Sequence, residues 1–274
     1  MAIAHLFQIA YSPESLAHVE PGYQVLDNLA NPRPDWYELA PIRRFLHELN
    51  PLDALDPQAF YGFFSPKFGS KTGLSRAQAQ EEIDAGAAAG ADVILFSPQP
   101  DMGAFFLNVF EQAEAFDAGF IAATQAWLAQ AGFAAPPLGQ LVMDTRVTVF
   151  SNYFAARPAF WREWLRWVDT LFDACERGPE SVRGALVQPT TYPGSAQRKV
   201  FIQERIASLI LTLQPQWRTH AANPFRMAWS ATRFRDHPEL AVMSDALKRA
   251  HRDLGFPCYL KAFGMLRQRF TQGS

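Results

Sequence analysis

Apolar and polar residues alternate in two patterns along the first part of the chain. Short apolar runs rich in strand-forming residues predict strands, and such runs cover 3–11, 23–26, 60–64 and 92–96. Between these runs, apolar residues recur every three or four positions over 35–48, which predicts a helix there. Ser75 as a cap and Gly90 as an end predict a second helix over 76–89. Strands alternating with helices predict an α/β fold class, with a mostly parallel sheet flanked by helices.

The pattern changes after Pro100, where helical periodicity dominates. Helices are expected over 105–116, 118–130, 158–176, 199–213 and 239–254, and one further strand over 147–150. Residues 177–195 combine glycine, proline and hydroxyl side chains, so we expect a loop there. The linker 134–137 separates residues 1–133 from a mainly helical part, 138–274. We expect this part to pack on the sheet, so that 1–274 form a single compact domain.

Charge and composition narrow the classes of function. The 25 basic and 27 acidic side chains give a formal net charge of −2, which argues against a nucleic-acid-binding protein. No apolar run reaches the roughly 18 residues that a membrane-spanning helix needs, and the N-terminus lacks the features of a signal peptide. The two cysteines, Cys175 and Cys258, have no metal-binding neighbours, so we expect buried thiols in a cytoplasmic protein.

Aromatic residues make up 14% of the chain, which is a high share. Most of them fall on the apolar faces of the expected helices and strands, where they predict a core. A minority lie beside polar loops, where a ring can stack on a nucleobase or a sugar. These are Tyr61, Phe68, Tyr153, Tyr192 and Trp229.

Several common catalytic signatures are absent from the sequence. It contains no GxGxxG, no GxxxxGK[ST], no GxSxG and no HExxH motif. Its histidines also show no metal-ligand spacing. These absences argue against a hydrolase triad and against a zinc enzyme.

Polar residues follow the expected strands, at the edge where α/β sheets bind ligands. They are Asn28 after the second strand, Lys67 and Lys71 after the third, Asp101 after the fourth, and Asn152 and Tyr153 after the strand over 147–150. Lysine binds phosphate as a point charge and arginine as a bidentate fork, so both lysines and the pair Arg43 and Arg44 are candidate contacts for a diphosphate. Simpler alternatives stay open, because the lysines can be surface charges and Asp101 can cap a helix.

One acidic residue stands inside an otherwise apolar helix. Glu204 and Arg205 are flanked by Ile202 and Ile206, so the carboxylate either reaches the wet face of the helix or enters the interior with partners. Two interpretations remain at this stage: a structural ion pair, and an active-site carboxylate.

Four short motifs resemble those of bacterial capsule and O-antigen polysaccharide glycosyltransferases. They are Pro-Ile-Arg-Arg at 41–44, Tyr-Gly-Phe-Phe-Ser at 61–65, Ser-Asn-Tyr-Phe-Ala-Ala-Arg-Pro-Ala-Phe at 151–160 and Gln-Glu-Arg-Ile-Ala-Ser-Leu at 203–209. In the transferases that the chain resembles, an asparagine-containing strand precedes an aromatic-rich helix, and a Glu-Arg-Leu helix closes the site. The similarity covers most of the chain, in the same order.

The resemblance implies a GT-A-like fold, in which 1–133 form a nucleotide-binding-like α/β half and 138–274 an acceptor-side half. It implies transfer of a sugar from a nucleotide-sugar donor to a glycan or lipid-linked acceptor, in the cytoplasm or at the inner face of the membrane. Glu204 or Asp101 would act as the base, and the lysines with Arg43 and Arg44 would stabilise the leaving diphosphate. Substrate-binding roles are expected for Asn28, Arg43, Arg44, Tyr61, Lys67, Lys71, Asn152, Tyr153 and Arg205.

The sequence departs from the family pattern at the fourth strand. GT-A enzymes usually carry Asp-x-Asp there to hold a divalent metal such as Mg²⁺ or Mn²⁺, whereas this chain runs Ser-Pro-Gln-Pro-Asp over 97–101 without a second carboxylate. Either cationic side chains replace the metal, or the protein is a non-catalytic accessory of a polysaccharide assembly cluster. An unrelated α/β enzyme acting on a phosphorylated small molecule is the remaining alternative.

Overall fold

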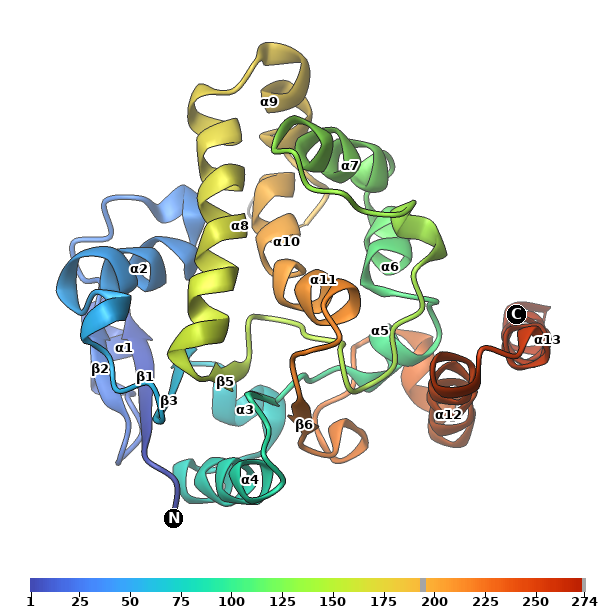
Figure 1. Ribbon diagram of the computed structural model, residues 1–274, viewed down its shortest axis with the longest axis horizontal. Helices are drawn as coiled ribbons and strands as arrows, with labels where there is room; N and C mark the ends of the chain where they lie inside the picture. Colours follow the sequence, from blue (N-terminus) through green and yellow to red (C-terminus); the bar gives the residue numbers. More distant parts are fainter. Residues whose placement is uncertain (193–195, 273–274) are drawn as a thin grey trace.

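The computed structural model describes residues 1–192 and 196–272, and within them six strands form one mixed sheet in the order β2-β1-β3-β5-β4-β6 (Figure 1). The strands are β1 (Ala4–Ala10), β2 (Gln24–Asp27), β3 (Phe60–Phe64), β4 (Val93–Leu95), β5 (Phe154–Ala156) and β6 (Thr219–Ala221). Only β5 runs antiparallel to its neighbours, β3 and β4, and the other described pairs are parallel. The α/β fold class with a mostly parallel sheet is therefore confirmed.

Helices cover the sheet and make up most of the second half of the chain. They are α1 (Pro13–Ala17), α2 (Leu39–Arg44), α3 (Phe68–Thr72), α4 (Arg76–Ala88), α5 (Pro100–Ala104), α6 (Val109–Phe116), α7 (Phe120–Gln130), α8 (Pro158–Arg177), α9 (Glu180–Leu186), α10 (Arg198–Gln203), α11 (Ile206–Leu213), α12 (Pro238–Leu254) and α13 (Pro257–Gln272). Short helical turns are η1 (Pro34–Trp36), η2 (Phe45–Leu49), η3 (Leu52–Ala54), η4 (Leu138–Gln140), η5 (Pro224–Arg226) and η6 (Arg233–Asp236). Figure 1 shows α8 rising from the sheet between α2 and α10, with α4 below and α12 and α13 at the far edge.

The longest helix illustrates how the sequence places these elements. Pro158 starts α8, and its apolar side, which includes the fully buried Phe160 and Trp164, packs into the main core. The indole nitrogen of Trp161 donates a hydrogen bond of 2.9 Å to the carbonyl of Tyr61, which ties α8 to β3. On the other face of the sheet, a Cβ at Gly86 would lie 2.3 Å from Cδ1 of Ile94, so the glycine allows α4 to approach β4.

Both halves of the chain contribute to one sheet, because β5 from the second half lies between β3 and β4 of the first. This insertion differs from the expectation of a strand over 147–150. Those residues are not in a strand, since the Val149 amide donates to the hydroxyl of Ser208 at 2.8 Å and the Phe150 amide to that of Ser97 at 3.0 Å. The position in the sheet belongs to residues 154–156 instead.

Other boundaries also differ from the sequence expectations. The helix expected over 35–48 is interrupted between η1 and α2, where the backbone of Tyr37 takes a positive φ of 47°, and η2 follows α2 directly. The helix expected over 199–213 is two helices, which are separated at Glu204 and Arg205. The loop expected over 177–195 contains α9, and its residues 193–195 lie outside the described part of the chain. β6 and α13 have no counterpart in the sequence expectations.

The two cysteines differ in their surroundings. Cys175 is buried in α8, as expected, and its burial raises the pKa of the thiol to about 12. The expectation was wrong for Cys258, which is exposed in the first turn of α13.

Candidate functional site

A cavity of about 850 Å³ opens at the carboxyl ends of three parallel strands. Tyr11 follows β1, Asn28 follows β2 and Ser65 follows β3, and all three residues line the cavity. From β1 the chain goes to β2 on one side and then back past β1 to β3 on the other, so the strand order reverses here, and α/β sheets bind ligands at such a reversal. The volume also falls within the range of roughly 300–1,000 Å³ that small-molecule sites occupy.

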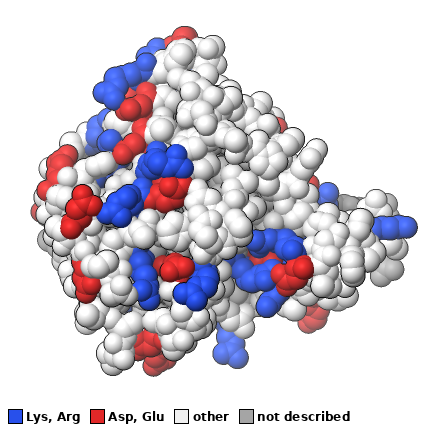
Figure 2. All heavy atoms as spheres, viewed as in Figure 1, with Lys and Arg blue, Asp and Glu red and all other residues white. Residues whose placement is uncertain are grey.

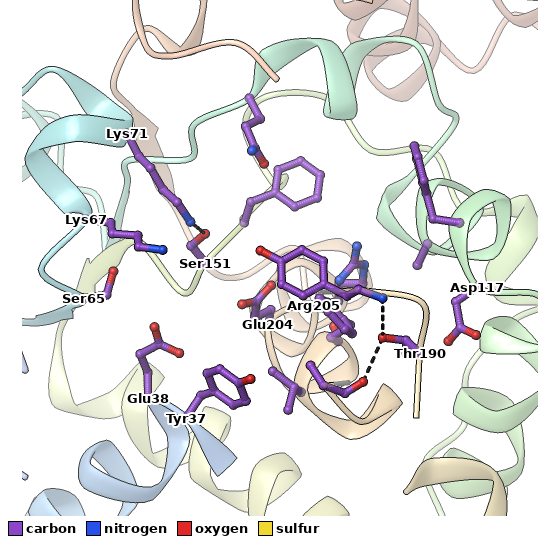
Figure 3. A pocket seen from close by; sticks show the side chains of 18 of the residues that line it. Tyr37, Glu38, Ser65, Lys67, Lys71, Asp117, Ser151, Thr190, Glu204 and Arg205 are labelled. Carbon is purple, nitrogen blue, oxygen red and sulfur yellow. Dashed lines mark hydrogen bonds between the residues drawn. The ribbon is translucent and has the colours of Figure 1, made fainter. Parts of the chain in front are cut away.

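Two lysines form the cationic wall of the cavity (Figure 3). Lys67 directly precedes α3 and is exposed, whereas Lys71 lies in the last turn of α3. The Lys71 ammonium donates a hydrogen bond of 3.0 Å to the hydroxyl of Ser151 and lies 5.6 Å from the ring centre of Tyr153. Within the described part of the chain, neither lysine has a carboxylate oxygen within ion-pair distance, 4.0 Å. Glu38 interacts electrostatically with both lysines over a longer distance, but neither ammonium is held in an ion pair within the described residues, so both can contact an anionic ligand.

Two carboxylates, Glu38 and Glu204, lie on other parts of the cavity wall (Figure 3). Glu38 connects η1 to α2, and Glu204 lies at the break between α10 and α11. Burial raises the pKa of Glu38, and the charges of Lys71 and Lys67 oppose this effect. Burial, followed by the negative charge of Glu38, raises the pKa of Glu204 to about 7, while Arg205 and Lys71 oppose the rise. Glu204 therefore exchanges a proton near neutral pH.

The Glu38 and Glu204 carboxylates also stand out because neither forms an ion pair within the residues that the structure describes. The interpretation of Glu204 and Arg205 as a structural ion pair is thus not supported. The Arg205 guanidinium instead donates to the carbonyls of Val109 at 2.9 Å and Phe201 at 2.8 Å. Its burial lowers the pKa to about 10. A buried cation that lacks a carboxylate partner adds positive potential to the cavity wall.

Backbone strain is concentrated around the same cavity. Among the described residues, the non-glycine positions with positive φ are Asn31 (35°), Tyr37 (47°), Asn152 (53°), Gln99 (59°) and Ser151 (59°). All of them except Asn152 line the cavity, and Asn152 directly follows Ser151. Such conformations cost about 1–3 kcal/mol each and cluster at binding and catalytic sites. The strain therefore supports a functional role for the cavity independently of its charges.

The structure brings some of the residues predicted from the sequence into the cavity lining: Asn28, Lys67, Lys71, Glu204 and Arg205. The other candidates do not line it. Arg43 pairs with Asp169 at 2.5 Å and lies over the ring of Phe172, and Arg44 donates to the backbone carbonyl of Asp27. Both guanidinium groups are thus engaged with the protein itself.

The remaining candidates are buried in the interior. Asp101 is fully buried and accepts hydrogen bonds from the amide, at 3.1 Å, and the hydroxyl of Ser230. Tyr61 and Tyr153 belong to the core clusters, and the Tyr153 hydroxyl is hydrogen-bonded to that of Ser65 at 2.5 Å. Asn152 is buried and donates to Gln203. None of these four residues lines the cavity.

Of the other aromatic residues that the sequence singled out, only one lines the cavity. Phe68 is fully buried in a core cluster, and Trp229 is half-buried beside Phe225. Tyr192 lines the cavity and is 58% exposed.

Sequence reasoning missed Glu38 and Tyr37, and it gave no individual role to Gln99 or Ser151; all four residues line the cavity. Acidic residues are common near the start of helices, because their negative charge interacts favourably with the helix dipole. Glu38 therefore gave no signal of a functional role in the sequence. Positive φ at Tyr37 and Ser151 has no sequence signature, since neither residue type favours that region.

The expected metal position does not fit a metal. Asp101 is the first carboxylate after β4, and its oxygens accept hydrogen bonds from Ser230. Across the described residues, no group of three or more His, Cys, Asp or Glu side chains is placed to hold a metal ion. We therefore assign no metal ligand and derive no step through a metal.

Comparison with protein-family models, with curated proteins and with solved structures finds no match for this chain. Within the described residues, no helix has both the length and the apolar character needed to cross a membrane. On the face shown in Figure 2, basic and acidic side chains lie next to one another, without the broad single-sign patch typical of nucleic-acid binding.

Proposed function

We propose that the protein is a glycosyltransferase, which moves a sugar from a nucleoside-diphosphate donor to a hydroxyl of a glycan or lipid-linked acceptor in surface polysaccharide assembly. One observation carries the proposal. In a single cavity at the carboxyl ends of β1, β2 and β3, the ammonium groups of Lys67 and Lys71, which form no ion pair within the described residues, accompany the carboxylate of Glu204, whose pKa is raised to about 7. The resemblance of four short motifs to those of capsule and O-antigen transferases favours the same function.

The cationic wall suits the departing group. When the bond between the sugar and the diphosphate breaks, the electron pair leaves with the diphosphate oxygen, and negative charge develops there. Lys67 and Lys71 are free of carboxylate partners in the described part of the chain, so they can stabilise this charge without first breaking an ion pair. The hydrogen bond to Ser151 holds the Lys71 ammonium in place.

Glu204 suits the attacking group. The acceptor oxygen forms the new bond to the sugar carbon, and its proton passes to the Glu204 carboxylate, which acts as general base. A base is most effective when its pKa lies near the working pH, and burial together with the charge of Glu38 places Glu204 there. Glu38 lies beside the lysines and is suited to hydrogen-bonding sugar hydroxyls. The reaction would take place in the cytoplasm, at the inner face of the membrane if the acceptor is lipid-linked.

The proposal is tested by calorimetric titration with a panel of uridine, cytidine, guanosine and thymidine diphosphate sugars, followed by product detection with mixed acceptors. We expect at least one donor to bind and to be consumed only when a hydroxyl acceptor is present. Binding without turnover would favour the non-catalytic accessory protein. Binding of simple sugar phosphates in preference to nucleotide sugars would favour an enzyme acting on a phosphorylated small molecule.

A further inference from the structure

Several exposed aromatic rings line the cavity. Among the described residues that line it, the exposed ones are Tyr11, Pro34, Tyr37, Lys67, Phe116, Thr191 and Tyr192. Four of these carry aromatic rings that are 44–58% exposed: Tyr11, Tyr37, Phe116 and Tyr192. We call these four residues the aromatic mouth. Phe256, at 55% exposure, is the other exposed large aromatic residue in the described chain, and it does not line the cavity.

The aromatic mouth draws on four separate segments of the chain. Tyr11 follows β1, Tyr37 lies between η1 and α2, Phe116 ends α6, and Tyr192 lies between α9 and α10. Exposed aromatic rings are costly to leave in water, and their collection around one opening from four segments indicates a binding surface. A ring face contacts a single sugar face at a time, so rings distributed around the mouth of a cavity of about 850 Å³ suit an extended ligand better than a monosaccharide.

The chemistry of the mouth distinguishes between possible ligands. Its exposed lining contains no leucine, isoleucine or valine in the described residues, although a lipid chain would favour such aliphatic contacts. Three of the four rings carry a phenolic hydroxyl. A sugar presents an apolar C–H face bordered by hydroxyl groups, and tyrosine matches it with an apolar ring and a polar tip. Lys67 is the only charged residue in the exposed, described lining, so the mouth itself favours a neutral ligand.

Backbone geometry adds a second observation. Tyr37 has φ 47° and ψ −129°, a conformation that a tyrosine rarely adopts, and the same residue is 44% exposed. The fold therefore keeps a strained backbone at a position where the side chain contributes little to the core. Strain of this kind persists at ligand clamps because it orients a group for binding.

From these observations we infer that the aromatic mouth is an oligosaccharide-binding site, in which Tyr37 and Tyr192 stack on successive sugars of a neutral glycan chain. The inference deepens the proposed function and rests on it for the reaction: the glycan is the acceptor, with its terminal hydroxyl directed into the cavity toward Glu204. Binding of the glycan itself requires neither donor nor turnover.

The test measures glycan binding directly. The probes are maltohexaose, cellohexaose, laminarihexaose and a glycan array of bacterial repeat-unit oligosaccharides, applied to the full chain without nucleotide. Saturation-transfer NMR identifies the glycans that bind and gives their dissociation constants. We expect at least one oligosaccharide to bind and glucose alone to bind far more weakly. Tyr37→Ala and Tyr192→Ala should each weaken oligosaccharide binding about three- to tenfold.

Phe256→Ala is the matched control, since it removes an exposed ring of similar exposure away from the cavity and should leave glycan binding unchanged. The inference is overturned if no oligosaccharide binds, or if the Tyr37 and Tyr192 variants bind as tightly as the wild type. It is also overturned if these two variants lose affinity for uridine or cytidine diphosphate instead, because the rings would then hold a nucleobase. If glycans bind as expected but no nucleotide sugar does, the proposed function fails and the oligosaccharide site stands.

Discussion

The side-chain amide of Asn152 donates a hydrogen bond of 2.7 Å to the side-chain oxygen of Gln203, and both residues are buried. This bond joins the two segments that hold the charged groups of the cavity. Ser151, which accepts the hydrogen bond of Lys71, directly precedes Asn152, and Glu204 directly follows Gln203. The interior thus fixes the relative positions of the cationic wall and the carboxylate that we propose as the base.

Substitution of Asn152 tests this positioning role. Asn152→Ala removes the hydrogen bond and places a less tolerant residue at φ 53°, so we expect a loss of about 1–3 kcal/mol in the free energy of unfolding. Asn152→Gly removes the same bond but accepts the positive φ, and should be about 1 kcal/mol more stable than the alanine variant. Urea denaturation measures both values. Equal stabilities of the two variants would show that the backbone conformation at this position carries no strain.

The cationic wall leads to a prediction about nucleotide affinity. Lys67→Ala and Lys71→Ala each remove a charged donor from the cavity, and a hydrogen bond to a charged group contributes about 1.5–3 kcal/mol. We therefore expect the dissociation constant for a nucleoside diphosphate to rise about 10- to 100-fold in each variant, and the effect to shrink at high salt. Calorimetry at two salt concentrations checks this. Lys261→Ala is the control, because Lys261 is exposed on α13 and does not line the cavity, and this variant should bind as the wild type does.

Much of the fold could be predicted from the sequence because it follows from local patterns. The apolar runs located β1, β2, β3 and β4, and the capping box at Ser75 marks the start of α4. The patterns failed where tertiary contacts decide the outcome. Residues 147–150 look like a strand, but the amides of Val149 and Phe150 bond to serine side chains. β6 has three residues like β4, but its sequence Thr-His-Ala lacks the apolar run that located β4.

The sequence predicted a site residue only where a charged side chain also stands at a distinctive place in the chain, such as the end of a strand. Lys67 and Lys71 follow β3 directly, and Glu204 interrupts an apolar run, so each left a signal in the sequence. Arg43 and Arg44 carry the same kind of signal but are engaged by Asp169 and by the carbonyl of Asp27. Glu38 and Tyr37 line the cavity at a turn where Tyr37 has a positive φ, and no pattern of residues predicts such a turn.

The burial of Asp101 predicts a structural role in place of the catalytic one that its position suggested. Its oxygens accept hydrogen bonds from the amide and hydroxyl of Ser230, and its side chain is fully buried. Asp101→Ala leaves these donors unsatisfied and should lower the free energy of unfolding by about 2–4 kcal/mol. Thermal unfolding measures the loss. At a temperature where the variant is folded, calorimetry should give the same nucleotide affinity as for the wild type. If the variant instead loses nucleotide affinity while its free energy of unfolding is unchanged, Asp101 belongs to the binding site after all.

The raised pKa of Glu204 leads to a prediction about the free energy of unfolding, which does not depend on the reaction that the protein catalyses. Burial and the charge of Glu38 raise this pKa from 4.5 to about 7, so the folded protein binds a proton more tightly than the unfolded chain does. The carboxyl group therefore lowers stability progressively as pH rises from about 4.5 to about 7. Glu204→Gln removes this cost and should be more stable than the wild type by roughly 1–3 kcal/mol at pH 8 and similar to it at pH 4. Urea denaturation at both pH values measures the difference.

The same titration governs activity if Glu204 is the base. Only the deprotonated form accepts a proton, so the rate of sugar transfer should increase with pH through about 7 and then level off. Glu204→Gln should lose at least about 100-fold in kcat while keeping its affinity for the donor, since general base catalysis contributes about 10²–10⁴-fold. Glu38→Gln removes the neighbouring negative charge, so the midpoint of the pH profile should move to lower pH. An unchanged kcat in Glu204→Gln would assign the base to another group, and an unmoved midpoint in Glu38→Gln would show that the two carboxylates do not interact.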